Sequence, residues 1–455
     1  MLTLSEIAAA VGGRVVGPAC SIRAVVTDSR TVTPGCLFVA LRGERFDGHK
    51  FVGEAARQGA AAALIDREPE PGGLPAVLVP DARLALGRLA AYWRRQLKAK
   101  VVAITGSNGK TSVKEMTAHI LSRAAACLAT EGNLNNDIGV PLTVLRCLKS
   151  HRYAVVEMGM NRPGEIASLA AIVAPDVACV TNAGLAHLAG LGSVRAIAEE
   201  KGQVYAALSA RGVAVVNADD QFADYWRGLA PGRVVTYGLK AAADVSATYA
   251  LGPAGSELML KTPSAPAPLP VTLAVLGRHN VVNALAAAAI AVALDIPGQT
   301  IREGLGAVRP VHGRLAAGPG YAGSCLIDDT YNANPDSARA ALDVLGHASG
   351  ERWFVLGDMA ELGPDAARLH GAFGEAAAQS GIEHLLTFGD LASHASHSFG
   401  AGARHYRDIE ELIADLRPAL HKGAVVLVKG SRSTRMERVV AGLRDTGGRH
   451  VSHPL

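Results

Sequence analysis

The stretch VVAITGSNGKTSVKEM, residues 101–116, carries the residues best suited to chemistry. An apolar strand pattern leads into a turn with two glycines, and Lys110 and Thr111 then open a helical pattern. The backbone N–H groups of such a turn and of the helix N-terminus bind phosphate oxygens. A lysine there neutralises the outer phosphates, and a threonine hydroxyl can ligate Mg²⁺.

The match to the general phosphate-binding motif G-x-x-x-x-G-K-[ST] is not strict, because Ile104 stands where its first glycine belongs. The alternative is an ordinary strand-to-helix turn that uses glycine for its bend. The order of strand, Gly-Lys-Thr and amphipathic helix favours nucleotide binding. We therefore expect a nucleoside triphosphate to contact Thr105, Gly106, Ser107, Asn108, Gly109, Lys110 and Thr111.

Polar residues near other predicted elements are candidates for further roles. Glu157 ends the strand YAVVEMGM and offers the oxygen ligand that Mg²⁺ prefers. His187 follows another strand end, where a lone histidine is as often structural. Lys201, in IAEEKGQVY, has the pattern of a surface helix lysine. Asn280 and Asn283 either cap a helix or read an adenine edge, and the pattern alone favours the cap.

Three predicted strands near the C-terminus end in polar residues. One such end is unremarkable, and turn chemistry around Pro335 would explain the first. Three in one block indicate a binding face, because the carboxyl ends of parallel strands meet at one sheet edge. The residues are Asp329, Tyr331, Asn332, Asn334, Asp358, Glu361, Lys429, Ser431 and Arg432.

The order of the elements predicts an α/β protein of three domains. Strands alternate with helices from residue 99 onward, which indicates parallel sheets covered on both faces. Residues 257–277 form two alternating runs around a Pro-rich loop and predict a hairpin. The Pro/Gly cluster at 309–320 marks a boundary. The expected domains span residues 1–98, 99–312 and 313–455.

The composition excludes several classes. A net charge of +4 spread over 455 residues gives no basic footprint for nucleic acid. Six cysteines without a C-x-x-C pair indicate reduced thiols, not disulfides or zinc ligands. The apolar run at 281–294 is too short to span a bilayer. The N-terminal segment MLTLSEIAAAVGGRVVG lacks a secretory pattern, so we expect a soluble cytoplasmic protein.

Motifs along the chain carry a resemblance to the ATP-dependent Mur ligase family. They are TGSNGKT, GNLNNDIGVPLTVL, EMGMNRPGEI, TNAGLAHL, GRHNVVNALAA, IDDTYNANPDS, VLGDMAELG and VKGSR, in that order. The likeness covers nearly the whole chain, and GNLNNDIG with YNANP is more specific than the phosphate-binding turn. Within the family, the chain most closely resembles the members that join D-alanyl-D-alanine to UDP-N-acetylmuramoyl-tripeptide.

The resemblance implies an N-terminal domain for the UDP substrate, a central P-loop ATPase-like parallel sheet and a C-terminal Rossmann-like domain. It implies ATP and Mg²⁺ as cofactors, with Thr111, Glu157 and His187 as metal ligands. Lys201 matches a lysine that the family carries as a carbamate, an anion that could hold a second Mg²⁺. The implied catalytic residues are Lys110, Glu157, His187 and Lys201.

The resemblance also implies contacts outside the turn. Asn283 matches an adenine contact, while Arg314 and Asp329 match groups that engage ATP after the third domain closes. The implied substrate-binding residues are Ser29, Arg30, Arg45, His49, Asn135, Asn332 and Asn334.

The implied reaction needs no protein nucleophile. The carboxylate of the UDP-linked peptide attacks the γ-phosphate to give an acyl phosphate, and the dipeptide amine then displaces phosphate. Closure of the third domain would keep water from the acyl phosphate. The partners are therefore small molecules, and a monomer suits domains that open and close.

Three alternatives stay open. A sister ligase would add diaminopimelate or lysine, but the diaminopimelate-adding type is expected to carry a DNPR motif that is absent here. A folylpolyglutamate synthetase would share the turn and the central fold but not the N-terminal DSR…DGH block. A regulatory module without ligase activity could lose any of the four catalytic residues and still fold.

Overall fold

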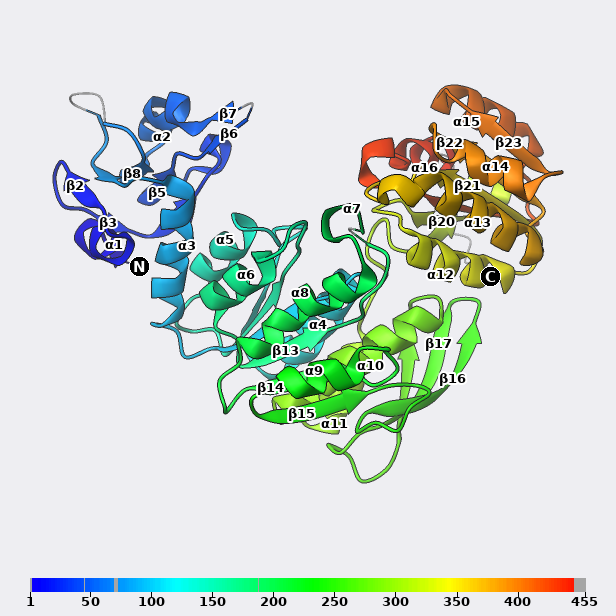
Figure 1. Ribbon diagram of the computed structural model, residues 1–455, viewed down its shortest axis with the longest axis horizontal. Coiled ribbons are helices and arrows are strands. Elements are labelled where there is room, and N and C mark those ends of the chain that lie inside the picture. The colour runs from blue at the N-terminus through cyan, green and yellow to red at the C-terminus, as the bar shows by residue number, and fades with distance from the viewer. Residues whose placement is uncertain (1, 45, 69–72, 187, 446–455) are drawn as a thin grey trace.

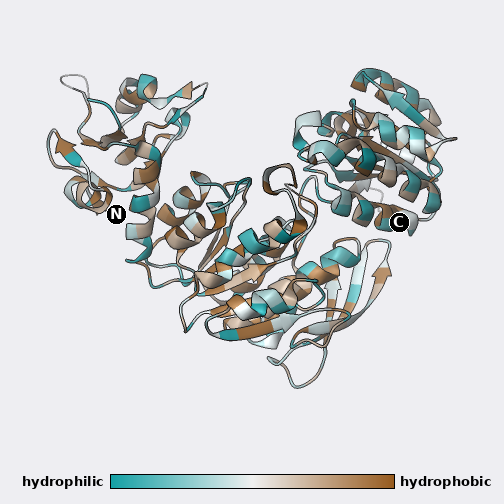
Figure 2. Cartoon of the chain, in the orientation of Figure 1, coloured by the Kyte–Doolittle hydropathy of each residue, from teal (hydrophilic) through white to brown (hydrophobic). Residues whose placement is uncertain are grey.

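The computed structural model describes residues 2–44, 46–68, 73–186 and 188–445. It has an α/β fold of three domains, and Figure 1 shows the N-terminal and C-terminal domains at opposite ends of the central one. The hydrophobic residues in Figure 2 gather along the strands, and hydrophilic residues mark the outer helices. The predicted fold class is confirmed.

The N-terminal domain is built on a five-stranded sheet of order β2-β9-β8-β5-β4. Its strands are β2 Arg14–Val16, β4 Ala24–Val26, β5 Cys36–Val39, β8 Ala62–Ile65 and β9 Ala76–Leu78. Short strand pairs join β1 Leu2–Thr3 to β3 Ser21–Ile22, and β6 Arg42–Gly43 to β7 Phe46–Asp47. The helices are α1 Leu4–Val11, α2 Val52–Arg57 and α3 Ala82–Arg94. Helix α3 leaves this domain and packs on α5 and α6 of the next.

The central domain contains a six-stranded parallel sheet of order β11-β12-β10-β13-β14-β15, as the alternating pattern predicted. Its strands are β10 Lys100–Thr105, β11 Cys127–Ala129, β12 Tyr153–Glu157, β13 Val177–Val180, β14 Val213–Asn217 and β15 Arg233–Tyr237. Its helices are α4 Lys110–Ala124, α5 Gly139–Leu145, α6 Glu165–Val173, α7 Leu188–Leu191, α8 Val194–Ala206, α9 Ala223–Leu229, α10 Arg278–Ala293 and α11 Gly298–Gly306.

The predicted hairpin is part of a larger sheet. Strands β17 Gly255–Lys261 and β18 Leu269–Leu273 pair antiparallel, and β16 Ser246–Gly252 adds a third strand. Helix α10 packs between this small sheet and the parallel sheet, so that almost every residue of its Ala-rich run is buried. Small side chains let the helix approach both sheets closely, which explains the alanine content.

The C-terminal domain has a six-stranded sheet of order β19-β20-β24-β21-β22-β23, parallel apart from the edge strand β19. Its strands are β19 Ala316–Pro319, β20 Cys325–Asp329, β21 Glu351–Gly357, β22 His384–Phe388, β23 Ala403–Tyr406 and β24 Ala424–Lys429. Its helices are α12 Pro335–Gly346, α13 Ala366–Gln379, α14 Ser393–Phe399, α15 Ile409–Leu416 and α16 Glu437–Leu443.

Several further expectations can be compared with the fold. All six cysteines are free, and three of them are buried. Among the described residues, no helix has both the length and the apolar character needed to cross a membrane. The expected domain limits near 98 and 312 fall between the described strands, and they stay predictions.

Candidate active site

The turn between β10 and α4 requires glycine at two points. Gly106 has a φ of 148°, and a Cβ built on it would lie 1.8 Å from Thr181 Oγ1. Gly109 has a φ of 82°, and its Cβ would lie 2.4 Å from Asn283 Oδ1. The backbone therefore approaches both neighbours more closely than any other residue would allow.

Asn182, which follows β13, fixes the turn from the side. The Ser107 N–H donates to the Asn182 carbonyl at 3.0 Å, and the Asn108 N–H donates to Asn182 Oδ1 at 2.9 Å. These two N–H groups are already bonded within the protein. The donors left for phosphate are those of the first turn of α4, which have no acceptor within the helix. Fewer backbone N–H groups of the turn are therefore available to bind phosphate than the motif predicted.

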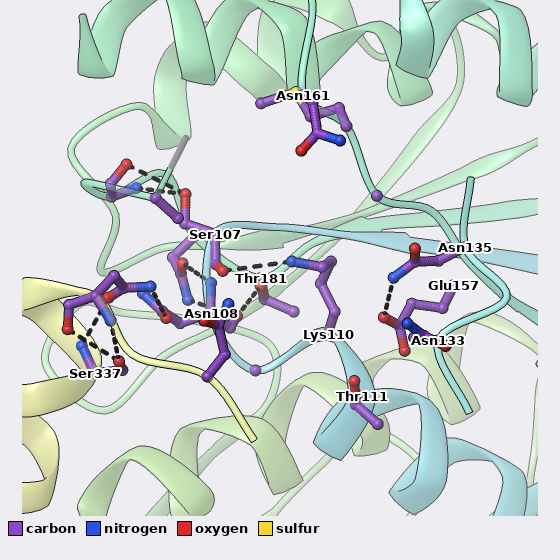
Figure 3. A pocket seen from close by; sticks show the side chains of 18 of the residues that line it. Ser107, Asn108, Lys110, Thr111, Asn133, Asn135, Glu157, Asn161, Thr181 and Ser337 are labelled. Atoms are coloured by element: carbon purple, nitrogen blue, oxygen red, sulfur yellow. Dashed lines mark hydrogen bonds between the residues drawn. The ribbon is translucent and has the colours of Figure 1, made fainter. Parts of the chain in front are cut away.

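Lys110 opens α4 and points across the turn toward Ser107, on the side away from Glu157 in Figure 3. Its Nζ donates to the Gly106 carbonyl at 2.6 Å. Burial lowers the pKa of Lys110, and the nearby Glu157 carboxylate partly offsets that effect. The lysine thus lies where it can exchange a backbone carbonyl for a phosphate oxygen.

Glu157 ends β12, whose register places it opposite Ile104 of β10. The side chain is 2% exposed, and Oε1 accepts a hydrogen bond from Asn135 Nδ2 at 2.8 Å. Oε2 is buried and accepts no hydrogen bond from the residues that the structure describes. A buried carboxylate oxygen without a donor is costly, and a hard cation such as Mg²⁺ would satisfy it. The residue therefore fits the predicted metal site.

Lys201 lies on α8 and is only 1% exposed, so the surface position predicted from its pattern is wrong. No described residue accepts a hydrogen bond from its side chain. Burial, together with the nearby Lys110 charge, places the pKa of Lys201 well below its usual value. Burial at this position therefore favours the neutral amine over the ammonium.

Arg314 reaches the nucleotide-binding turn from the start of the C-terminal domain. Its Nη2 donates to Thr111 Oγ1 at 2.9 Å, across 203 residues of sequence. The guanidinium carbon also lies 4.1 Å from the centre of the Tyr331 ring, a favourable cation–π distance. The hydroxyl predicted to ligate a metal is thus already touched by a residue predicted to bind ATP.

Asp329, at the end of β20, is held within its own domain. Its Oδ2 accepts a hydrogen bond from Lys429 Nζ at 2.6 Å, and its Oδ1 accepts one from the Leu315 N–H at 3.3 Å. Burial raises the pKa of Asp329 although the Lys429 charge opposes this shift. Leu315 has a φ of 50°, a strained value for leucine, directly after Arg314. Asp329 therefore secures the segment that presents Arg314.

The two predicted asparagines of the YNANP loop have local roles as well. Asn334 caps α12: its side chain accepts from the Ser337 N–H, and the Ser337 hydroxyl accepts from the Asn334 N–H. This agrees with the turn chemistry expected around Pro335. Asn334 Nδ2 also donates to Asn108 Oδ1 at 2.8 Å, which links the loop to the nucleotide turn. Asn332 accepts from the Ala333 N–H through its side chain and from Lys429 through its carbonyl.

The helix-cap interpretation of Asn280 and Asn283 is wrong. Helix α10 begins after Gly277, and no side chain caps it. Asn283 instead lies against Gly109 of the turn, and its Nδ2 donates to Asn280 Oδ1 at 3.0 Å. This position beside the turn is compatible with the adenine contact that the resemblance implies.

A cleft of about 2070 Å³ brings many of these residues together. The predicted residues that line it are Ser107, Asn108, Gly109, Lys110, Thr111, Asn135, Glu157, Asn283, Arg314, Asp329, Asn332 and Asn334. Thr105, Gly106 and Lys201 lie behind this lining; Thr105 and Lys201 are fully buried.

The predicted residues of the N-terminal domain do not line the cleft. Ser29 is buried on a short 3-10 helix, and Arg30 forms an exposed ion pair with Asp28. His49 Nδ1 lies 2.9 Å from Asp47 Oδ1, and its Nε2 accepts from the Asp66 N–H. Arg30 and His49 are therefore each paired with acidic residues of the same domain. Arg45 and His187, and the tail at 446–455, lie outside the described residues.

Sequence reasoning missed residues that shape the cleft. Asn182 fixes the turn, Asp336 of α12 accepts from the Leu185 N–H, and Arg83 of α3 forms an ion pair with Asp137. Asn182, Asp137 and Asp336 stand inside quoted motifs, which was a usable signal. Arg83 stands in none of them and acquires its partner only through the domain arrangement.

Three family models match the chain in order. The model of the Mur ligase family catalytic domain matches residues 21–94, the Mur ligase middle domain matches 104–291, and the glutamate ligase domain matches 313–432. Fold and site define a three-domain nucleotide-dependent ligase, and the chain belongs to the Mur ligase family.

Individual relatives are similar over nearly the full length. A protein of Escherichia coli K12 named UDP-N-acetylmuramoyl-tripeptide–D-alanyl-D-alanine ligase is 44% identical over 98% of this chain and 99% of its own. A crystal structure of MurF from Acinetobacter baumannii matches with 38% identity and a TM-score of 0.90, over 97% of this chain and 98% of its own. MurF from Thermotoga maritima in complex with ADP matches with 29% identity and a TM-score of 0.82, over 92% of this chain and 96% of its own.

Proposed function

We propose that this chain is an ATP-dependent ligase that adds D-alanyl-D-alanine to UDP-N-acetylmuramoyl-tripeptide, giving the UDP-linked pentapeptide precursor of peptidoglycan. The observation that carries the proposal is the meeting of Lys110, Glu157 and Arg314 at one nucleotide-binding turn. The full-length similarity to ligases of that name supports the choice of substrates.

Each residue has a role that its position supports. Lys110 holds the outer phosphates, and the free N–H groups at the start of α4 bind their oxygens. Asn283 lies beside the turn where an adenine contact is expected, and Arg314 approaches from the C-terminal domain. Ser29, Arg30 and His49 hold the UDP end of the substrate, at a distance from the reacting centre that a long peptide-bearing substrate spans.

The chemistry runs in two steps. The terminal carboxylate of the tripeptide attacks the γ-phosphate of ATP, the bond to ADP breaks, and an acyl phosphate forms. The dipeptide amine then attacks the acyl carbon, loses a proton, and releases phosphate as the peptide bond closes. Lys110 and Arg314 neutralise the charge that moves between the phosphate oxygens. Contact between the C-terminal domain and the turn excludes water from the acyl phosphate.

Glu157 and Thr111 would hold Mg²⁺, and His187 would join them. Mg²⁺ in that position supplies charge neutralisation at the phosphates. The orphaned Oε2 of Glu157 supports this assignment, although the described residues contain no group of three or more histidine, cysteine or acidic side chains that could hold a metal by itself. A neutral, buried Lys201 is the form that reacts with CO₂ to a carbamate, which would add the second anion the site needs.

The test measures phosphate release with ATP, Mg²⁺ and UDP-N-acetylmuramoyl-tripeptide, with and without D-alanyl-D-alanine. Mass spectrometry then looks for the UDP-linked pentapeptide. We expect turnover that depends on the dipeptide and disappears in Lys110→Ala. Turnover that ignores the dipeptide but follows diaminopimelate, lysine or glutamate would reassign the substrate. We also propose that the protein acts as a cytoplasmic monomer.

A further inference from the structure

Helix α12 of the C-terminal domain meets the loop after β13 at one close contact. The Leu185 N–H donates to Asp336 Oδ2 at 2.8 Å, across 151 residues of sequence. The contact favours glycine at the preceding position, since a Cβ on Gly184 would lie 2.3 Å from the same oxygen and would displace the carboxylate. Gly184 does not have a positive φ, so the nearby carboxylate, and not backbone strain, is the reason that glycine is favoured at this position.

The loop that receives Asp336 is bonded to the nucleotide-binding turn on its other side. Ser107 Oγ accepts from the Gly184 N–H at 2.9 Å and lies 3.3 Å from the Gly184 carbonyl. Two residues before Asp336, at the N-cap of α12, Asn334 Nδ2 donates to Asn108 Oδ1 at 2.8 Å. The start of α12 is therefore linked to two consecutive residues of the nucleotide turn. Asn334 contacts Asn108 directly, and Asp336 is linked to Ser107 through the backbone of residues 184–185.

Resting on the function proposed above, we propose that Asp336 is a positioning residue that docks the C-terminal domain onto the nucleotide-binding turn through the backbone of residues 184–185. The docking sets where Arg314 lies, because Arg314 reaches Thr111 from the same domain. A charge-assisted hydrogen bond to a backbone N–H is strong and directional, and its geometry fails when the domain rotates. Asp336 lines the cleft, and its carboxylate is bonded to the Leu185 backbone, so its role is to position the domain and not to react.

A purely structural role is the competing explanation. Asp336 stands in the first turn of α12, where a carboxylate stabilises the helix through its dipole. Removing it would then lower the melting temperature and leave the kinetics unchanged. Asp343, on the same helix, is exposed and has no side-chain hydrogen bond among the described residues, so Asp343→Ala controls for the loss of a carboxylate from α12. Because Asp343 stands near the C-terminal end of the helix, where a carboxylate opposes the dipole, its removal should not lower the melting temperature.

The experiment compares Asp336→Ala, Asp336→Asn, Gly184→Ala and the double variant of both alanines. We expect Asp336→Ala to lower kcat about tenfold, the loss of one hydrogen bond to a charged group, while the affinity for ADP changes by less than about twofold. Asp336→Asn keeps an accepting oxygen and should restore most of the rate. Gly184→Ala should act like Asp336→Ala, and the double variant should be no worse than either, because the added Cβ then meets no carboxylate.

A second readout does not depend on ligase activity. Small-angle X-ray scattering should give a larger radius of gyration for Asp336→Ala than for wild type and for Asp343→Ala. An unchanged kcat, a loss of ADP affinity equal to the loss of kcat, or additive effects in the double variant would each overturn the proposal. If wild type shows no dipeptide-dependent turnover, the proposed function fails, and scattering still decides whether Asp336 docks the domain.

Discussion

Two buried carboxylates stand at equivalent strand ends in two domains, and they differ in how many of their oxygens are hydrogen-bonded. Asp329 of the C-terminal domain has both oxygens bonded, one to Lys429 and one to the Leu315 N–H. Glu157 of the central domain has one oxygen bonded to Asn135 and the other without a partner. The bonds to both oxygens let Asp329 hold the segment around Arg314, whereas the free oxygen of Glu157 keeps a place for a cation. The difference distinguishes a carboxylate with a structural role, Asp329, from one that is available to bind a cation, Glu157.

The largest expected effect is on activity at the unsaturated carboxylate. Glu157→Gln keeps the acceptor for Asn135 but removes the charge, so we expect kcat to fall by about 10²-fold or more and the Mg²⁺ requirement to rise. Stability to urea should not decrease, because the orphaned charged oxygen is lost. Magnesium titration of the reaction rate measures the change in kcat and in the Mg²⁺ requirement, and urea denaturation measures the stability. A rate within twofold of wild type would remove Glu157 from the metal site.

The saturated carboxylate should respond in stability. Lys429→Met leaves Asp329 buried without its ion-pair partner, and we expect a loss of about 3 kcal/mol in the free energy of unfolding of the C-terminal domain. Denaturant unfolding, followed by Trp353 fluorescence, measures it. Adding Asp329→Asn should recover part of the loss. An unchanged midpoint for Lys429→Met would mean that the pair does not support the domain.

His279 adds a pH dependence to the same region. Burial, with a smaller effect from the Lys429 charge, lowers the pKa of His279 from 6.5 to about 4. Because the unfolded chain takes up the proton first, this stability is complete above about pH 6.5 and declines as the pH falls toward 4. The decline should be about 2 kcal/mol, allowing for the part of the ring that solvent reaches. Unfolding measured from pH 4 to 7 should slope less in His279→Gln; an identical slope would contradict the prediction.

The smallest effect is expected in the N-terminal domain, where the charged side chains are exposed and paired. Arg30 is 84% exposed in its ion pair with Asp28, so Arg30→Ala should leave the stability almost unchanged. If it contacts the UDP group, KM for that substrate should rise about tenfold while kcat stays constant. Steady-state kinetics with varied UDP-substrate measure this. An unchanged KM would exclude Arg30 from the UDP site.

Residues whose roles follow from local backbone rules were predictable, and residues whose roles depend on partners distant in the sequence were not. The strand, the two glycines and Lys110 are neighbours in sequence, so the turn follows from local backbone rules. Glu157 was found because a strand end predicts its place on the sheet edge. Lys201 was misplaced on the surface, since helical periodicity does not report what packs over α8. Asn283 was misread as a cap because α10 begins at Arg278, which places Asn283 inside the helix.

The sequence by itself determined the parallel sheets, the nucleotide-binding turn and the family, because each depends on short-range patterns of residue type. Only the tertiary structure decided which carboxylate keeps a free oxygen, that Lys201 is buried, and that Asp336 meets Leu185 across 151 residues. The physical reason is that satisfaction of a polar group and burial of a charge are properties of neighbours in space. Such neighbours come from strands and domains that the chain order does not place side by side.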